Sequence, residues 1–161
     1  MRLTGLLWTA LLALAACSPP AGAGASSSPA AASTAHPVSG LPVIPLTVIT
    51  AGKAHRLQVE IARSEEEQAK GLMFRTAMGA NEGMIFPMDP PRRASFWMRN
   101  TVIPLDIIFI GADRRILNIA ANAVPYSEAS LASSGAVSAV LELNGGRAAQ
   151  LGIAPGDRVA W

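Results

Sequence analysis

Short runs rich in Val, Ile and Leu recur along the chain from about residue 44 onwards. The runs lie at 44–50, 56–62, 84–88, 95–99, 105–110, 116–120 and 137–143. Their lengths suit β-strands, which usually span roughly 3 to 10 residues in globular proteins. Short connections between most of them favour antiparallel pairing. The pattern predicts a mainly β domain of the α+β class, with a compact, antiparallel, barrel-like sheet and one or two short helices.

Residues between the runs predict where the chain turns. The segment from Gly111 to Asp113 separates two apolar runs and predicts a hairpin connection. Pro155 and Gly156 fit the central pair of a type II turn, because proline favours the first central position and glycine accepts positive φ at the second. This turn would lead into a last strand at 158–161.

One helix has a clear start and stop. Ser64 can cap the helix, Glu67 stands at the capping-box spacing, and Gly71 can end it. We therefore predict a helix over 64–72. A second short helix is expected at 147–151, directly before a glycine.

The first residues of the chain have the pattern of a secretory signal. Arg2 precedes an apolar run at 6–16 that is interrupted only by Thr9. A membrane-spanning helix needs about 20 apolar residues, so this run is too short for a stable span. A positive start followed by a short apolar run is typical of a signal peptide, here residues 1–16.

The only cysteine of the chain follows this run directly, in Leu14-Ala15-Ala16-Cys17. These residues resemble the lipobox read by the lipoprotein-processing signal peptidase. The resemblance implies cleavage before Cys17 and several acyl chains on it, which anchor a protein durably where one chain would not. Membrane lipid is then the first expected partner. The uncharged Ser18 resembles the sorting pattern for the periplasmic face of the outer membrane; the alternative is an ordinary secretory signal with an incidental cysteine.

The segment after the cysteine has the composition of a flexible linker. Between residues 18 and 40 nearly every residue is Ala, Gly, Ser or Pro. Such a segment buries too little apolar surface to offset its chain entropy. We therefore expect a lipidated cysteine and linker at 17–40 and a single β-rich domain at 41–161.

Charge and cysteine content exclude several functional classes. Removing Arg2 leaves 12 of the 13 Lys and Arg residues against 11 Asp and Glu residues, which gives no concentrated positive patch for nucleic acid. With Cys17 used by lipid, no thiol remains for a disulfide, a nucleophile or a Cys-ligated zinc site. No P-loop, Gly-x-Gly-x-x-Gly, His-Glu-x-x-His or Gly-x-Ser-x-Gly motif is present.

Several segments in order carry a family resemblance. They read RSEEEQAKGLMFR from Arg63, then GMIFPM, FWMRNTVIPLDIIFI, VLELNGG and LGIAPGDRV. Together they resemble the bacterial and archaeal family known as domain of unknown function 192, over about 100 residues. The resemblance implies a compact β-rich domain that is often exported. It brings no established activity, so no catalytic residue is carried over.

Asp106 stands out because it lies within an apolar run. A buried carboxylate needs a partner or takes a raised pKa, because desolvation penalises its charge. Arg99, Arg75 and Arg63 are the candidate partners, since a guanidinium can bind a carboxylate through two hydrogen bonds. The pair would either pin the sheet or form the polar base of a pocket.

The segment around Trp97 combines an aromatic ring, a guanidinium and an amide. If the strand alternates, Phe96 and Met98 face one side, and Trp97 and Arg99 face the other. Together with Asn100, that second face could grip a sugar or an anion. We favour a ligand pocket on it over plain packing.

Glu142 offers a further carboxylate. Period-2 alternation directs its side chain away from the face that carries Leu141 and Leu143, which we expect to be the main core. Asp106 and Glu142 could divide acid and base roles in glycoside hydrolysis, provided that they line one cleft. This is the enzymatic alternative.

Methionines suggest a second alternative. Met73, Met78, Met84, Met88 and Met98 lie close together in the sequence, and thioethers suit Cu(I). Methionine is also a common gap-filler in protein cores, and no histidine lies among these residues. Core packing is the preferred interpretation.

The leading hypothesis is a membrane-anchored, non-catalytic binding or accessory domain for a small polar ligand, a glycan or a protein partner. The candidate ligand-binding residues are Trp97, Arg99, Asn100, Asp106, Arg75 and Glu142. No residue is assigned a catalytic role, and no metal, cofactor or nucleic acid is expected.

Overall fold

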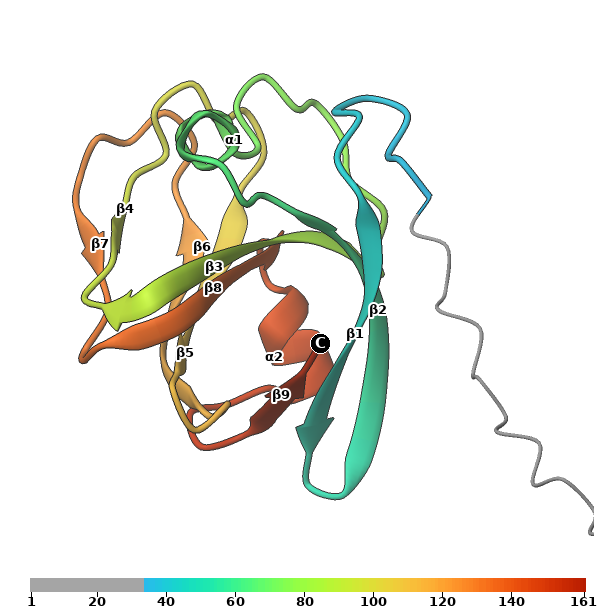
Figure 1. Ribbon diagram of the computed structural model, residues 1–161, viewed down its shortest axis with the longest axis vertical. Helices are drawn as coiled ribbons and strands as arrows, with labels where there is room; N and C mark the ends of the chain where they lie inside the picture. Colours follow the sequence, from blue (N-terminus) through green and yellow to red (C-terminus); the bar gives the residue numbers. More distant parts are fainter. Residues whose placement is uncertain (1–33) are drawn as a thin grey trace, which may run out of the picture. The chain divides into compact units, whose positions relative to one another are not determined.

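The computed structural model describes residues 34–161; the predicted signal peptide and Cys17 lie outside them. A seven-stranded sheet in the order β6-β5-β8-β3-β2-β1-β9 forms its body, and β4 and β7 form a separate two-stranded sheet (Figure 1). The strands are β1 Val43–Thr50, β2 Lys53–Ile61, β3 Glu82–Arg92, β4 Ser95–Phe96, β5 Leu105–Gly111, β6 Ile116–Ala123, β7 Leu131–Ala132, β8 Val137–Asn144 and β9 Arg158–Ala160. The helices are α1 Glu65–Lys70 and α2 Arg147–Leu151.

The mainly β fold with two short helices is confirmed, although the sheet is mixed. β2 and β3 pair in parallel, with Gln58 opposite Glu82. A parallel pair needs a crossover, which the connection 62–81 with α1 supplies. The edge strands β6 and β9 do not pair as strands; an isolated bridge between Arg115 and Arg158 and a few backbone hydrogen bonds beside it join the start of β6 to β9. The sheet is therefore curled but not closed into a barrel.

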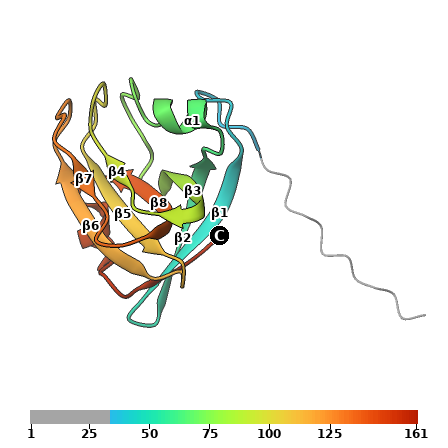
Figure 2. The same cartoon turned by 60° about the vertical axis from the view of Figure 1, so that its left-hand side comes forward.

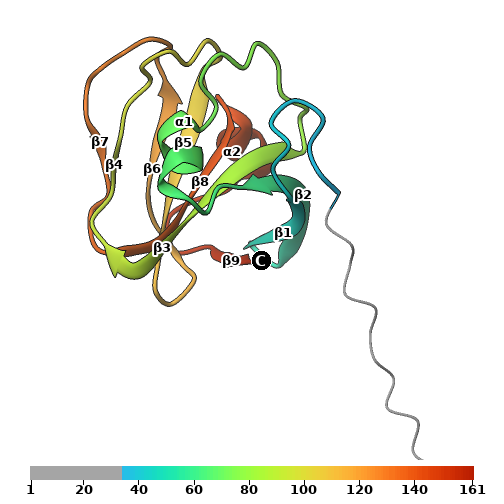
Figure 3. The same cartoon turned by 45° about the horizontal axis from the view of Figure 1, so that its top comes forward.

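Both predicted helices form, and local signals explain them. The Ser64 hydroxyl accepts a hydrogen bond from the N–H of Glu67 at 3.2 Å, and the Glu67 carboxylate accepts one from the N–H of Ser64 at 2.8 Å. Gly71 follows α1 with φ +46°, and Gly152 follows α2 with φ +71°, a region that favours glycine. Figures 1 and 2 show α1 at one end of the curved sheet, and Figure 3 brings that end forward.

The predicted turns are also present, whereas one strand is shorter than predicted. β5 and β6 pair antiparallel across the 111–113 connection, and Gly156 takes φ +94° in the turn before β9. The strand predicted at 95–99 is reduced to Ser95–Phe96. Asn100 adopts φ +56°, which ends the extended backbone there.

The sheet is packed on both faces. One cluster of buried side chains includes Leu46, Val48, Leu57, Val59, Ile85, Ile108, Ile110, Leu141 and Leu143. The other includes Met84, Phe86, Met98, Leu105, Ile107, Phe109 and Val140. The prediction that Glu142 points away from the main core is therefore incomplete, because its face of β8 is buried as well. Every residue of β5, which lies between β6 and β8, is buried.

The end of the predicted linker contacts the folded part. Ala35 forms a β-bridge with Pro42, and the hydroxyl of Ser39 hydrogen-bonds to the carboxylate of Glu60. Residues 35 and 39, which precede the predicted boundary at residue 41, thus make contacts with the folded part. Within 34–161, no helix has the length and hydropathy needed to cross a membrane.

Candidate functional site

A pocket of about 390 Å³ lies between α1, the end of β3, β4 and the central strand β8. Residues 68–73 contribute one side of it, and Phe86, Met88 and Arg92 of β3 contribute another. Its size falls within the range of about 300 to 1,000 Å³ that is common for small-molecule sites. The curled sheet and α1 thus border an open hollow of ligand size.

Glu142 lies at the base of this pocket. Its side chain is 4% exposed, and its partners in register on the two neighbouring strands are the apolar Met84 and Ile107. Among the described residues, no side chain or backbone group forms a hydrogen bond with its carboxyl group. Burial raises the pKa of Glu142 to about 8, because desolvation penalises the carboxylate. At pH 7 the group is mostly the neutral acid.

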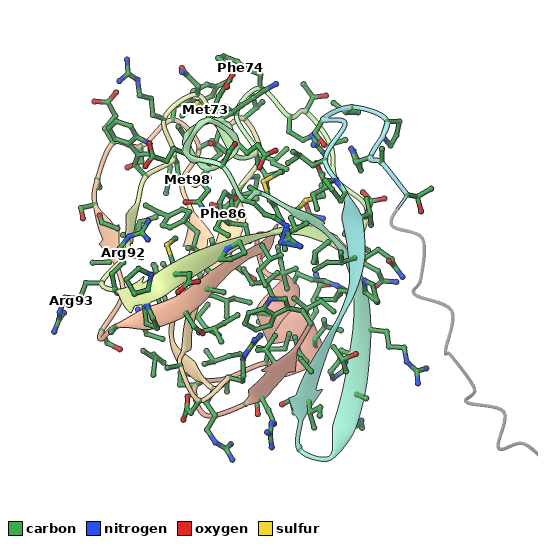
Figure 4. The ribbon with its side chains drawn as sticks, viewed as in Figure 1. Met73, Phe74, Phe86, Arg92, Arg93 and Met98 are labelled. Carbon is green, nitrogen blue, oxygen red and sulfur yellow. The ribbon has the colours of Figure 1, made fainter. Side chains whose placement is uncertain are left out.

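Aromatic side chains form the wall next to Glu142. Phe86 and Phe96 meet edge to face, with ring centroids 5.2 Å apart and an interplanar angle of 76°. Phe96 makes a similar contact with Phe109 at 6.3 Å, so the rings hold one another in place. Figure 4 shows Phe86, with Met73, in the region between β3 and α1. The pocket therefore has a rigid apolar wall beside a single buried acid.

Two basic residues, Lys70 and Arg92, line the pocket from α1 and from the end of β3. Both are exposed, which places their side chains at its mouth. Neither lies within 4.0 Å of a carboxylate among residues 34–161. Arg93 does not line the pocket, and Figure 4 shows it directed away from the body of the molecule. The mouth is thus positive, whereas the base carries an acid.

Of the six predicted ligand-binding residues, Trp97 and Glu142 line this pocket. Trp97 is 48% exposed at its rim. The guanidinium of Arg99 lies 5.5 Å from the centre of the Trp97 ring and 3.8 Å from Glu128, on the surface. Asn100 turns the chain, and its side-chain amide contacts the sulfur of Met73 at 3.9 Å. Arg99 and Asn100 therefore border the site without lining it.

Asp106 is fully buried, but its predicted arginine partner is wrong. Its carboxylate accepts hydrogen bonds from three backbone N–H groups, those of Asn122 at 2.9 Å, Gly146 at 2.9 Å and Ala148 at 2.7 Å. Gly146 caps α2 and Ala148 lies in its first turn. Asp106 therefore joins β6 and α2 to β5, which is a structural role.

The strand register also excludes the alternative function, a hydrolase that would use Asp106 and Glu142 as a pair of carboxylates. Ile107 stands opposite Glu142, whereas Asp106 stands opposite Leu143. Because successive side chains of a strand point to opposite faces, Asp106 and Glu142 lie on opposite faces of the sheet. They cannot share a substrate.

Arg75, another predicted ligand-binding residue, forms an ion pair inside the domain. Its guanidinium donates two hydrogen bonds to the carboxylate of Glu60, at 2.9 and 3.0 Å, and both side chains are buried. The imidazole of His36 lies 3.7 Å from the same carboxylate. Arg75 therefore fastens the segment after α1 to β2 and is not a partner of Asp106.

The methionines fit packing better than copper binding. Met84, Met88 and Met98 are buried among apolar side chains, and Met78 packs against the same cluster. Within 34–161, no three His, Cys, Asp or Glu side chains are grouped as metal ligands would be.

Sequence reasoning missed Lys70, Arg92 and Thr101 as pocket residues, and it assigned Phe96 to the face opposite Trp97, whereas both line the pocket. These residues come from separate elements, and no spacing rule joins them. Arg92 follows two prolines in a short polar stretch, which resembles an ordinary loop. The usable signals are Glu142, a lone acid in an apolar strand, and Trp97, an aromatic residue beside Arg99.

Comparisons with known proteins identify relatives without an assigned activity. The model of the DUF192 family, described as an uncharacterized ACR, matches residues 47–161. A crystal structure of a protein of unknown function from Novosphingobium aromaticivorans DSM 12444 is 62% identical, covers 82% of this chain and 94% of its own, and superposes with a TM-score of 0.79. A structure from Sinorhizobium meliloti 1021, named as a candidate transcription regulator, is 42% identical, with coverages of 74% and 94% and a TM-score of 0.73. No curated protein matches the chain.

Proposed function

The chain belongs to the DUF192 family, which supplies no activity, and from its own residues we propose a membrane-tethered domain that binds a small polar molecule in the Glu142 pocket. The proposed role is binding or accessory, without a catalytic step. A glycan or a protein would be bound at the exposed Trp97 rim, whereas a small molecule can reach Glu142.

The buried, unpartnered carboxyl group of Glu142 carries this proposal. Its oxygens line the pocket, where a ligand can reach them, while the apolar side chains around it desolvate the carboxylate at a cost in stability. Replacing Glu142 by an apolar residue would remove that cost, since Met84 and Ile107 beside it are apolar. A ligand that bonds to the carboxyl group gives a reason for an acid at this position.

The sequence supports the membrane tether. Cys17 follows an apolar run that is too short to span a bilayer, and Leu14-Ala15-Ala16-Cys17 resembles a lipobox. Several acyl chains on Cys17 would hold the domain at a membrane surface. We propose the periplasmic face of the outer membrane as that surface, because Ser18 is uncharged.

A thermal-shift screen tests the binding role. Small amino acids, amines, organic acids and sugars are added to the wild-type chain, to Glu142→Gln and to Glu128→Gln. We expect one class to raise the melting temperature of the wild type by several degrees, because a ligand that binds only the folded state stabilises it. Glu128→Gln, which changes an exposed acid, should respond like the wild type.

Glu142→Gln should lose most of this response. If no class shifted the wild type, or if Glu142→Gln responded equally, the binding role of the pocket would be rejected.

A further inference from the structure

We infer that the ligand of the Glu142 pocket is a small zwitterion, with an ammonium group at the base near Glu142 and an anionic group at the mouth near Lys70 and Arg92. This inference rests on the proposed binding role and names the chemical class of the ligand. An amino-acid-like compound is the simplest molecule of this class.

Two lining residues, Gln68 and Thr101, already use their side-chain hydrogen-bond donors within the fold. The side-chain amide of Gln68 donates to the carbonyl oxygens of Ala62 at 3.3 Å and Pro87 at 2.9 Å. The hydroxyl of Thr101 donates to the carbonyl oxygen of Arg99 at 3.3 Å. What remains available on these side chains is acceptor oxygen.

In its ionised form, the carboxyl group of Glu142 adds two more acceptor oxygens, which no described group engages. A ligand that satisfies several acceptors must bring several donors. An ammonium group brings three and accepts none. The inner end of the ligand is therefore expected to be an amine.

The aromatic wall favours the same chemistry. Phe86 and Phe96 line the same pocket as Glu142, and Trp97 stands at the rim. The negative face of an aromatic ring attracts a cation. An anionic inner end would gain nothing from these rings and would meet the carboxyl group of Glu142.

The two basic residues at the mouth of the pocket favour an anionic group at the outer end of the ligand. Lys70 reaches the pocket from α1 and Arg92 from the end of β3, and among its lining residues these two and Glu142 are the ionisable ones. Their charges are unpaired among residues 34–161, so an anionic group leaving the pocket would meet both. Guanidinium groups bind carboxylates through paired hydrogen bonds.

Binding an ammonium should depend on pH in a defined direction. The ammonium pairs with ionised Glu142, and burial holds the pKa of the free group at about 8. The ionised fraction then rises about tenfold from pH 7 to pH 9. The amine stays charged over this range, because its pKa is near that of lysine, about 10.4. Affinity should therefore increase with pH, whereas an anion bound to neutral Glu142 would bind more weakly.

Three ligands that share a five-carbon chain test the inference by titration calorimetry on the full chain in neutral detergent. They are 5-aminopentanoate, pentanoate and pentylamine, each at pH 7 and pH 9. We expect 5-aminopentanoate to bind the wild type at least tenfold more tightly than pentanoate does, and about tenfold more tightly at pH 9 than at pH 7.

Variants separate the two ends of the ligand. Glu142→Gln should weaken 5-aminopentanoate at pH 9 at least tenfold and abolish the pH dependence. Arg92→Gln should weaken 5-aminopentanoate severalfold and leave pentylamine unchanged. Arg93→Gln is the matched control, because this neighbouring arginine lies outside the pocket, and it should bind like the wild type.

Other outcomes overturn the inference. Pentanoate binding as tightly as 5-aminopentanoate, affinity falling towards pH 9, or unchanged binding by Glu142→Gln would each exclude an ammonium at the base. Absence of binding by all three compounds would also exclude the zwitterion. The proposed function would fail separately, if the thermal-shift screen found no ligand of any class.

Discussion

Glu142 is a buried acid whose charge depends on folding. In the unfolded chain its pKa returns to an ordinary value near 4.5, whereas in the folded protein burial raises it to about 8. Between these values the unfolded state releases a proton that the folded state keeps. The neutral form of Glu142 therefore makes its full contribution to the free energy of unfolding below pH 4.5, and this contribution is lost as the pH rises towards 8.

This linkage predicts the pH dependence of stability for Glu142→Gln. The variant should lose the part of the pH dependence due to this group, and it should be more stable than the wild type at pH 9. The rise in the pKa of Glu142 from 4.5 to about 8 corresponds to a change of at most about 5 kcal/mol in the free energy of unfolding. Urea unfolding of both proteins at pH 5, 7 and 9 measures the difference.

Glu128→Gln is the control for that measurement, because Glu128 is exposed. Its stability should follow the wild type at each pH. Equal loss of stability in the wild type and Glu142→Gln between pH 5 and pH 9 would show that Glu142 is not the titrating group.

At the level of elements, Asp106 connects parts of the chain that hydrophobic packing alone would leave loosely joined. Its carboxylate binds backbone N–H groups of Asn122, at the end of β6, and of Gly146 and Ala148, at the start of α2. A negative charge at a helix start also interacts favourably with the helix dipole. One side chain thus fixes how β8 leads into α2.

Asp106→Asn should destabilise the protein by about 3 kcal/mol. Asparagine offers one acceptor oxygen, so at least one buried N–H group would face an amide donor and stay unsatisfied. Chemical denaturation at pH 7 measures the loss. Asp113→Asn is the control, because Asp113 accepts a single bond from Arg115 in an exposed turn, and it should change stability by less than about 1 kcal/mol.

A loss no larger in Asp106→Asn than in Asp113→Asn would contradict this role. Circular dichroism of both variants checks that the fold is retained.

At the scale of the whole molecule, the proposed tether and the pocket are separate features of one chain. The described residues begin at 34, and 16 residues lie between Cys17 and that position in the sequence. If lipid holds Cys17, the domain should stay folded when the anchor is removed, because the core clusters involve residues from 41 onwards.

Cys17→Ser should therefore move the protein from the membrane to the soluble fraction without lowering its melting temperature. Fractionation after salt and carbonate extraction measures the location. Ser28→Ala, a change in the same linker, should leave the protein in the membrane fraction. Full retention of Cys17→Ser in the membrane after extraction would exclude lipid on Cys17 as the anchor.

The sequence alone determined features that depend on neighbouring residues. The capping box of Ser64 and Glu67, the hairpin at 111–113 and the turn at Gly156 follow from local hydrogen bonds and allowed φ values, so short motifs predict them. Apolar runs likewise located most strands, because strand formation requires a local pattern. They also identified Glu142 and Trp97 as residues to examine.

Tertiary structure alone decided which residues meet. Arg75 bonds Glu60, and Asp106 bonds backbone groups around Gly146; sequence distance carries no information on such partners. The face of β8 that bears Glu142 became a core because other strands and α1 cover it. The pocket exists for the same reason: its walls come from segments that only the folded sheet brings together, and burial there sets the charge of Glu142.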